Sequence, residues 1–175
     1  MLGCKQVLIK SDKDTPAVLE YLCCESAKLS NCGIYYSRQL YFKTGRVPNR
    51  AQLHKVLGTE NQNLHYKAFY SDTAQQILTG LAESFKSFWG LLKGIKNGTV
   101  TQRPKLPGYR QSGMALVTFT GRSVKLKDGM LRFPLGSKVK AWFGLDSFFR
   151  QMPSNIEFKA IREYRILPCN GYFYL

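Results

Sequence analysis

The strongest pattern in the sequence is a run of apolar residues between Ser71 and Lys96 that recur at spacings of three and four. Because an α-helix has 3.6 residues per turn, these spacings place the apolar side chains on one stripe. The pattern predicts a long amphipathic helix that packs against a second helix, expected over residues 16–43, in an antiparallel bundle. The stripe consists of Ala74, Ile77, Leu78, Leu81, Phe85, Phe88, Leu92 and Ile95.

Shorter patterns predict the other elements. Residues 4–10 form a partly β-branched run that predicts a strand. Cys32-Gly33 is a potential break in the first helix. Asn49-Arg50-Ala51-Gln52 matches a capping box, which predicts a shorter helix that stops at Gly58. After a loop, alternating apolar residues predict strands over 114–120, 124–127, 130–133, 138–143, 156–167 and 172–175, with a helical turn over 147–152.

This order of elements indicates an α+β fold. One strand precedes the helical region, and five or six strands follow it. We therefore expect a β-barrel with an inserted helical bundle, in which the first strand returns to pair with the C-terminal sheet. The chain ends within the apolar run Tyr172–Leu175, an ending that suggests a fragment or a split gene product.

The charge of the chain narrows the class of partner. There are 26 Lys+Arg against 11 Asp+Glu, a net charge of +15, while 44% of the residues are hydrophobic. Such an apolar content excludes a disordered basic tail. A folded domain with this excess attracts polyanions, nucleic acid first and an anionic membrane surface second. The excess is greatest from Lys86 to Lys140, where twelve basic residues accompany a single acid, Asp128.

A rigid basic loop from Arg103 to Arg110 lies within this segment. Its prolines limit chain freedom, Gly108 allows the backbone to approach a phosphate, and Tyr109 can stack on a base. The simpler alternative is a basic interdomain linker.

Catalytic and metal sites are not indicated by the sequence. The acidic residues are scattered, no C-x-x-C pair occurs, and the five cysteines are predicted to be reduced thiols. There is neither a Walker loop nor a G-x-S-x-G elbow. Because no apolar stretch has the length of a signal peptide or a membrane span, we expect a cytoplasmic, nucleoid-associated protein without a membrane partner.

Five motifs occur in a characteristic order: Asn31, Tyr35-Tyr36-Ser37-Arg38-Gln39, Phe85–Lys93, the loop Arg103–Arg110 and Val124–Pro134. In these motifs the chain resembles the N-terminal half of the OrfB/TnpB proteins. These are transposase-associated, transposon-encoded, RNA-guided DNA endonucleases related to the compact type V CRISPR effectors.

The resemblance implies a wedge domain, an oligonucleotide-binding-like β-barrel formed by residues 1–13 and 114–175. It implies a helical recognition domain over 14–97 and a basic Pro/Gly loop over 98–113. The implied partners are guide RNA from the transposon end, double-stranded target DNA and a separate nuclease half. The family's RuvC-like nuclease and zinc ribbon would follow residue 175. Mg²⁺ and Zn²⁺ are therefore expected only there, and this chain alone is expected to have no cofactor and no enzymatic activity.

The resemblance also suggests residues for binding. Contacts to the transposon-adjacent motif of the DNA fall on Gln75 and Thr120. A glutamine can bond adenine bidentately, and a threonine offers a hydroxyl and a methyl to thymine. In the simpler interpretation, Gln75 is an ordinary exposed residue of a helix and Thr120 is an ordinary β-branched residue of a strand. Tyr109 is the candidate for base stacking, and the candidates for binding the nucleic-acid backbone are Lys86, Lys93, Lys96, Arg103, Lys105, Arg110, Arg122 and Lys125.

Three functions are then to be compared. The first is an RNA-guided, motif-reading binding module. The second is a stand-alone transposon regulator that binds DNA through a helix-turn-helix formed by residues 16–58. The third is a complete metal-dependent nuclease or strand transferase, which would need acidic residues that converge on a metal.

Overall fold

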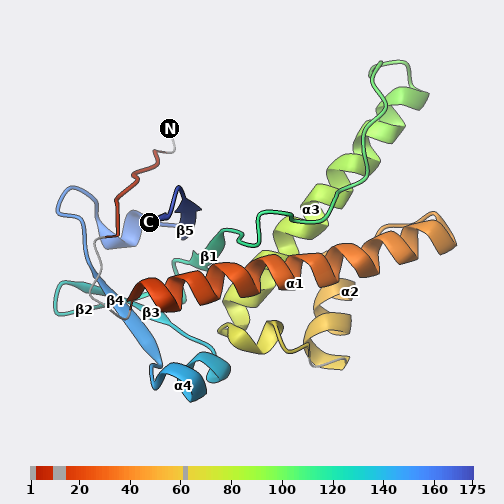
Figure 1. The fold of residues 1–175 in the computed structure, drawn as a ribbon. Coiled ribbons are helices and arrows are strands. Elements are labelled where there is room, and N and C mark those ends of the chain that lie inside the picture. Colours follow the sequence, from red (N-terminus) through yellow and green to blue (C-terminus); the bar gives the residue numbers. More distant parts are fainter. Residues whose placement is uncertain (1–2, 10–14, 61–62) are drawn as a thin grey trace.

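The computed structural model of the chain describes residues 3–9, 15–60 and 63–175. Over these residues, two long helices lie against two small antiparallel sheets (Figure 1), which confirms the α+β class. The helices are α1 (Thr15–Thr44), α2 (Arg50–His54), α3 (Ser71–Lys96) and α4 (Ser137–Phe143), with the π- and 3-10-helical turns η1 (Lys55–Glu60), η2 (Tyr66–Ala68) and η3 (Phe158–Ala160). The strands are β1 (Val117–Thr120), β2 (Lys125–Lys127), β3 (Met130–Pro134), β4 (Ser147–Gln151), β5 (Glu163–Cys169) and β6 (Tyr172–Tyr174).

The helix predicted from the apolar stripe is α3, and both of its ends are as predicted. Leu78 and Leu81 of this stripe lie against Gly33 of α1, where a Cβ would collide with the Leu81 side chain. Gly33 therefore does not break α1 but allows the two helices to approach closely. Figure 1 shows α3 crossing α1, with both helices running toward the same end of the molecule. The predicted antiparallel packing is not observed.

The predicted capping box is present at the start of α2. Asn49 Oδ1 accepts a hydrogen bond from the Gln52 backbone N–H at 2.9 Å, and Gln52 Oε1 accepts one from the Asn49 backbone N–H at 2.9 Å. Instead of stopping at Gly58, the chain continues as the π-helical turn η1. Because Leu53 and Leu57 are buried, the core anchors this segment from one side.

The two sheets have the strand orders β1-β5-β6 and β2-β3-β4. Aromatic rings join them: Phe133 of β3 stacks on Phe148 of β4 at a centroid distance of 4.7 Å. Its edge contacts reach Phe119 of β1 at 5.3 Å and Tyr164 of β5 at 5.4 Å. The sheets therefore share one aromatic core, although the described strands do not close into a barrel.

The N-terminal segment returns to the C-terminal sheet, as expected. The Val7 N–H donates to the Leu175 carbonyl at 2.8 Å, and the Leu175 N–H donates to the Val7 carbonyl at 2.9 Å. Leu8 forms an isolated bridge with Tyr174. The described residues of the predicted strand thus pair with the right partner through a single bridge, while Lys10 lies outside the described residues.

Three predictions in the C-terminal part were wrong. Residues 138–143 lie in the helix α4, residues 147–151 form the strand β4, and η3 occupies part of the strand predicted over 156–167, of which only the part from Glu163 onward is a strand. The alternation of 138–143 resembles a strand, but tertiary packing overrides it. Gly144 ends α4 in the left-handed conformation with a φ of 69°, and the Gly136 backbone lies so close to η2 that a side chain would strike its backbone.

A buried carboxylate connects α1 with α4 and the segment before η2. The Glu25 side chain is only 3% exposed, and its oxygens lie 2.9 Å from Lys28 Nζ, 2.9 Å from His65 Nδ1 and 3.7 Å from Lys138 Nζ. Burial alone would raise the pKa of this carboxyl. Hydrogen bonds from His65 and Lys28, together with their positive charge, outweigh burial and lower the pKa below its ordinary value.

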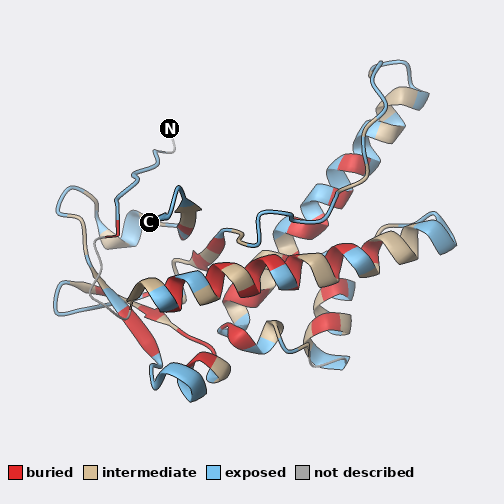
Figure 2. Cartoon of the chain, viewed as in Figure 1, coloured by how far each residue is buried: buried red, intermediate tan, exposed pale blue. Residues whose placement is uncertain are grey.

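Burial is concentrated where α1, the first half of α3 and the sheets meet (Figure 2). Phe88 is the last buried residue of α3, so the end of this helix projects from the core. Among the described residues, no helix has both the length and the apolarity needed to cross a lipid bilayer. The division into domains stays a prediction.

Candidate nucleic-acid interface

The basic loop after α3 runs back along α1 (Figure 1), and polar side chains of α1 hold it there. Asn31 Nδ2 donates to the Arg110 carbonyl at 3.2 Å, while Asn31 Oδ1 accepts from the Arg110 backbone N–H at 2.8 Å. Arg38 Nη1 donates to the Pro107 carbonyl at 3.3 Å. Asn31 and Arg38 belong to motifs of the family resemblance, and here both bind the backbone of the loop.

Two further contacts fix the end of the loop before β1. Ser26 Oγ donates to the Leu116 carbonyl at 2.8 Å, and the Ala115 N–H donates to the Cys23 carbonyl at 2.9 Å. All of these contacts use backbone atoms of the loop. Its charged side chains are therefore left exposed to solvent.

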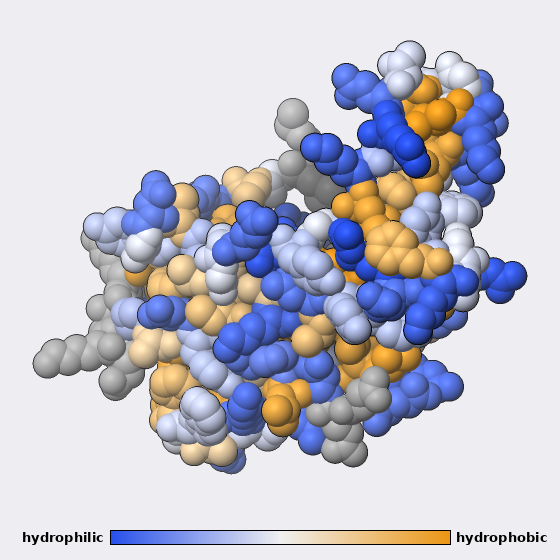
Figure 3. Space-filling model, turned by 45° about the vertical axis from the view of Figure 1, so that its right-hand side comes forward, coloured by the Kyte–Doolittle hydropathy of each residue, from blue (hydrophilic) through white to orange (hydrophobic). Residues whose placement is uncertain are grey.

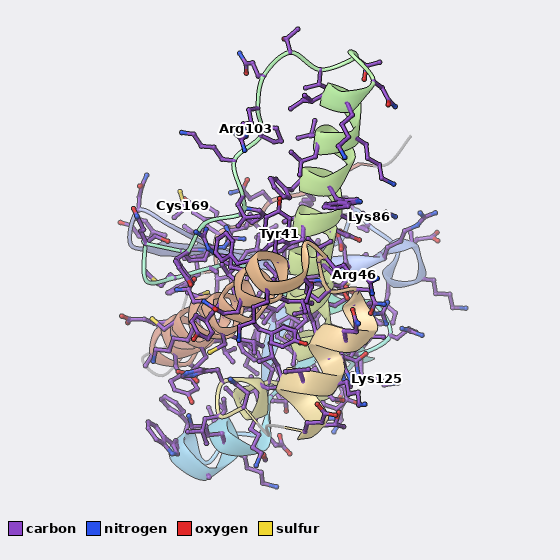
Figure 4. All side chains as sticks on the ribbon, turned by 90° about the vertical axis from the view of Figure 1, so that its right-hand side faces the viewer. Tyr41, Arg46, Lys86, Arg103, Lys125 and Cys169 are labelled. Atoms are coloured by element: carbon purple, nitrogen blue, oxygen red, sulfur yellow. The ribbon has the colours of Figure 1, made fainter. Side chains whose placement is uncertain are left out.

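The structure divides the eight predicted backbone-binding cations into two sets. Six are exposed on α3 and the loop, and we call them the helix–loop cations: Lys86, Lys93, Lys96, Arg103, Lys105 and Arg110. Arg122 and Lys125 are also exposed but lie after β1 and on β2, near the sheets. Figure 4 shows Lys86, Arg103 and Lys125 at three separate places. The eight residues therefore do not form one patch.

The two residues predicted to contact the DNA motif are close to each other. Thr120, at the end of β1, donates a hydrogen bond through its hydroxyl to Asp72 in the first turn of α3. Gln75 follows Asp72 by three residues, so both lie on the same side of the helix. Sequence reasoning missed Asp72, because its link to Thr120 joins residues 48 positions apart.

The surroundings of Gln75 are polar. Its side chain lies beside Tyr66, where burial raises the pKa of the hydroxyl against the lowering effect of Gln75. The Tyr66 hydroxyl also hydrogen-bonds His54 Nε2 at 2.7 Å. A depression of about 420 Å³ opens here, lined by Asn49, Arg50, Ala51, His54 and Gln75.

A second depression, of about 370 Å³, continues along α3 and shares Asn49 and Arg50 with the first. Together they form a groove between the capped start of α2 and α3, which runs from Gln75 to Lys86 and Trp89. The acid in its lining is Glu83.

Tyr109, the predicted stacking residue, is 48% exposed on the loop. The Arg38 guanidinium lies over its ring, 5.6 Å from the centroid. Sequence reasoning missed this partner. The signal available was the place of Arg38 in a polar and aromatic stretch outside the apolar stripe of α1.

No group of three His, Cys, Asp or Glu side chains that could hold a metal occurs among the described residues. No family model matches the chain, and no curated protein matches it at a significant level of similarity.

Proposed function

We propose that the chain is the nucleic-acid-binding part of an RNA-guided DNA endonuclease of the OrfB/TnpB type. In this proposal it holds the guide RNA and reads the transposon-adjacent motif of the target DNA. The observation that carries the proposal is the basic loop fixed on α1. Because the hydrogen bonds from Asn31 and Arg38 go to backbone atoms of this loop and its charged side chains stay exposed, the helix–loop cations remain available for phosphates.

The finer fold proposal is a wedge domain, an oligonucleotide-binding-like barrel, with a helical recognition domain inserted over residues 14–97. Two observations support it. Residues 7–9 lie beside β6, and one aromatic core joins both sheets. The barrel would be partly open, as such folds are.

We assign phosphate binding to the helix–loop cations. We assign a separate contact with the nucleic-acid backbone to Arg122 and Lys125. Motif reading is assigned to Gln75 and Thr120, with Asp72 as an additional acceptor for base amino groups. Cleavage would belong to a separate nuclease part with its own Mg²⁺ and Zn²⁺. No catalytic role is proposed for this chain.

The first test is the nucleic acid that the protein carries. Purified at moderate salt from cells that contain its gene and flanking DNA, it should retain a discrete RNase-sensitive species. That RNA should bind more tightly than random RNA of equal length, because structured recognition adds to counterion release. If the protein is free of RNA and binds duplex DNA tightly, the helix-turn-helix regulator is favoured instead. This alternative has less support because α2 has only five residues.

Substitution of the motif-reading residues should change selectivity more than affinity. In a selection from DNA randomised beside the guide-matched target, Gln75→Ala should lower discrimination at one position by about 5- to 150-fold, the range of a bidentate base contact. Thr120→Ala should lower discrimination at a second position by less, because a threonine contact is not bidentate. Affinity for the guide RNA should stay within about twofold.

Neighbouring residues of the same type are the controls. Gln76→Ala on α3 and Thr118→Ala on β1 alter half-buried residues of the same elements, and both should leave selectivity unchanged. If control and test variants lower selectivity equally, or if the test variants lose RNA binding, Gln75 and Thr120 have a structural role instead.

A further inference from the structure

Aromatic side chains gather at the surface where the C-terminal half of α1 meets the loop. The Arg38 guanidinium lies 5.7 Å from the ring centroid of Phe42 and 5.6 Å from that of Tyr109. These rings remain 63% and 48% exposed. Tyr35, 58% exposed, precedes Arg38 by three residues and Phe42 by seven, which places it on the same helix face. We call Tyr35, Arg38, Phe42 and Tyr109 the aromatic strip.

The strip is held in place by buried neighbours. The Arg38 hydrogen bond to Pro107 fixes the guanidinium and the loop together. Tyr41, next to Phe42, makes an edge contact with the buried Phe88 at 5.6 Å and with Trp89 at 6.4 Å. The rings are thus presented by a rigid helix and a fixed loop, so little conformational entropy is lost when a ligand binds.

The charges around the strip have a single sign. Residues 38–50 contain four Lys or Arg and residues 86–110 contain six, and neither segment contains Asp or Glu. Figure 4 shows Arg46 and Lys86 near Tyr41, and Figure 3 shows apolar side chains on the projecting end of α3 bordered by strongly hydrophilic ones. Exposed aromatic faces between cations are suited to bases and phosphates at once.

We propose that the aromatic strip binds an unpaired stretch of RNA, with bases stacked on Phe42, Tyr109 and Tyr35 and phosphates held by the neighbouring cations. Duplex RNA does not fit this role, because its bases are stacked within the helix and present no free faces. The inference rests on the proposed function, in which the strand is part of the guide RNA.

The test removes the aromatic faces but keeps apolar bulk. The double variant Phe42→Leu with Tyr109→Leu should bind a fluorescein-labelled, non-pairing 12-nucleotide RNA about fivefold more weakly for each ring lost, measured by anisotropy. Affinity for the duplex of the same sequence should change less than about twofold. The variant Phe42→Tyr with Tyr109→Phe keeps both rings and should retain binding of the single strand.

The matched control is Phe149→Leu with Tyr172→Leu, two exposed aromatic residues on β4 and β6. It should bind the single strand as the unchanged protein does. The proposal is overturned if the control loses as much as the test variant, if duplex binding falls equally, or if the leucine variant binds normally. The proposal would also be overturned if the aromatic strip bound single-stranded DNA but not RNA, or anionic phosphatidylglycerol vesicles but not RNA.

Failure of the inference is distinguishable from failure of the proposed function. If the protein binds RNA with steep salt dependence and the leucine variant binds it equally well, the proposed function is retained and the role of the aromatic strip is rejected. A protein that binds neither strand nor duplex loses both.

Discussion

Replacing the six helix–loop cations with glutamine will flatten the salt dependence of RNA binding. Each phosphate neutralised by the protein contributes about −0.7 to −0.9 to the slope of log affinity against log salt, so loss of six contacts reduces the slope by about four to five. The loop should keep its place, since Asn31 and Arg38 hold its backbone atoms. Anisotropy titrations over a series of salt concentrations measure the slope directly.

A control with the same number of charges tests the location of the surface. Six exposed cations near the sheets are available for the same replacement: Arg122, Lys125, Lys127, Lys140, Lys159 and Arg162. This control should reduce the slope by about two at most, from Arg122 and Lys125. If instead it removes most of the slope, the interface lies on the sheets and the assignment to α3 and the loop is wrong.

The second large effect concerns stability. Glu25→Gln will lower the free energy of unfolding by about 1.5–3 kcal/mol, the contribution of hydrogen bonds to a charged group. The reason is that His65, Lys28 and Lys138 converge on a carboxylate that is nearly inaccessible to water. Urea unfolding followed by circular dichroism measures the change. Glu20→Gln, an exposed position on the same helix, should change stability by less than about 0.5 kcal/mol.

The pH dependence of this effect has a definite sign. Because the pKa of Glu25 is lowered in the folded protein, the stabilisation is complete above the pKa of an unfolded glutamate, about 4.3. It is lost as the pH falls through the lower folded value. The difference in stability between the unchanged protein and Glu25→Gln should therefore shrink in acid. A difference that is constant across this range would show that the carboxylate charge is not what stabilises the fold.

Sequence reasoning succeeded where local physics decides the structure. The periodicity of Ser71–Lys96 determines α3, and the capping residues Asn49 and Gln52 determine the start of α2. It failed over residues 138–151, where a strand-like alternation became α4 and the following segment became β4. There the pairing of β4 with β3 and the approach of Gly136 to η2 decide the outcome, and neither can be read from the segment itself.

In the candidate site, too, local features could be predicted from the sequence, whereas contacts between distant residues could not. The basic character of α3 and the loop could be predicted from composition, because charges that are not paired remain exposed. The link from Thr120 to Asp72 and the binding of the loop by Asn31 could not, since these contacts join residues 48 and 79 positions apart. Sequence reasoning did not single out Glu25 among the scattered acids, because two of its three partners, His65 and Lys138, lie on other elements.

The way α1 holds the loop has a consequence for natural variation. Asn31 and Arg38 direct their hydrogen bonds to main-chain atoms of the loop, namely the N–H and carbonyl of Arg110 and the carbonyl of Pro107. Of these atoms, only the N–H is absent from proline. The side chains at 103 and 105 can therefore diverge between species without altering the path of the loop, whereas Asn31 and Arg38 should be retained, together with Tyr109, whose ring contacts the Arg38 guanidinium. A lineage that adapts to a different nucleic acid would accumulate its substitutions in the loop and spare the helix.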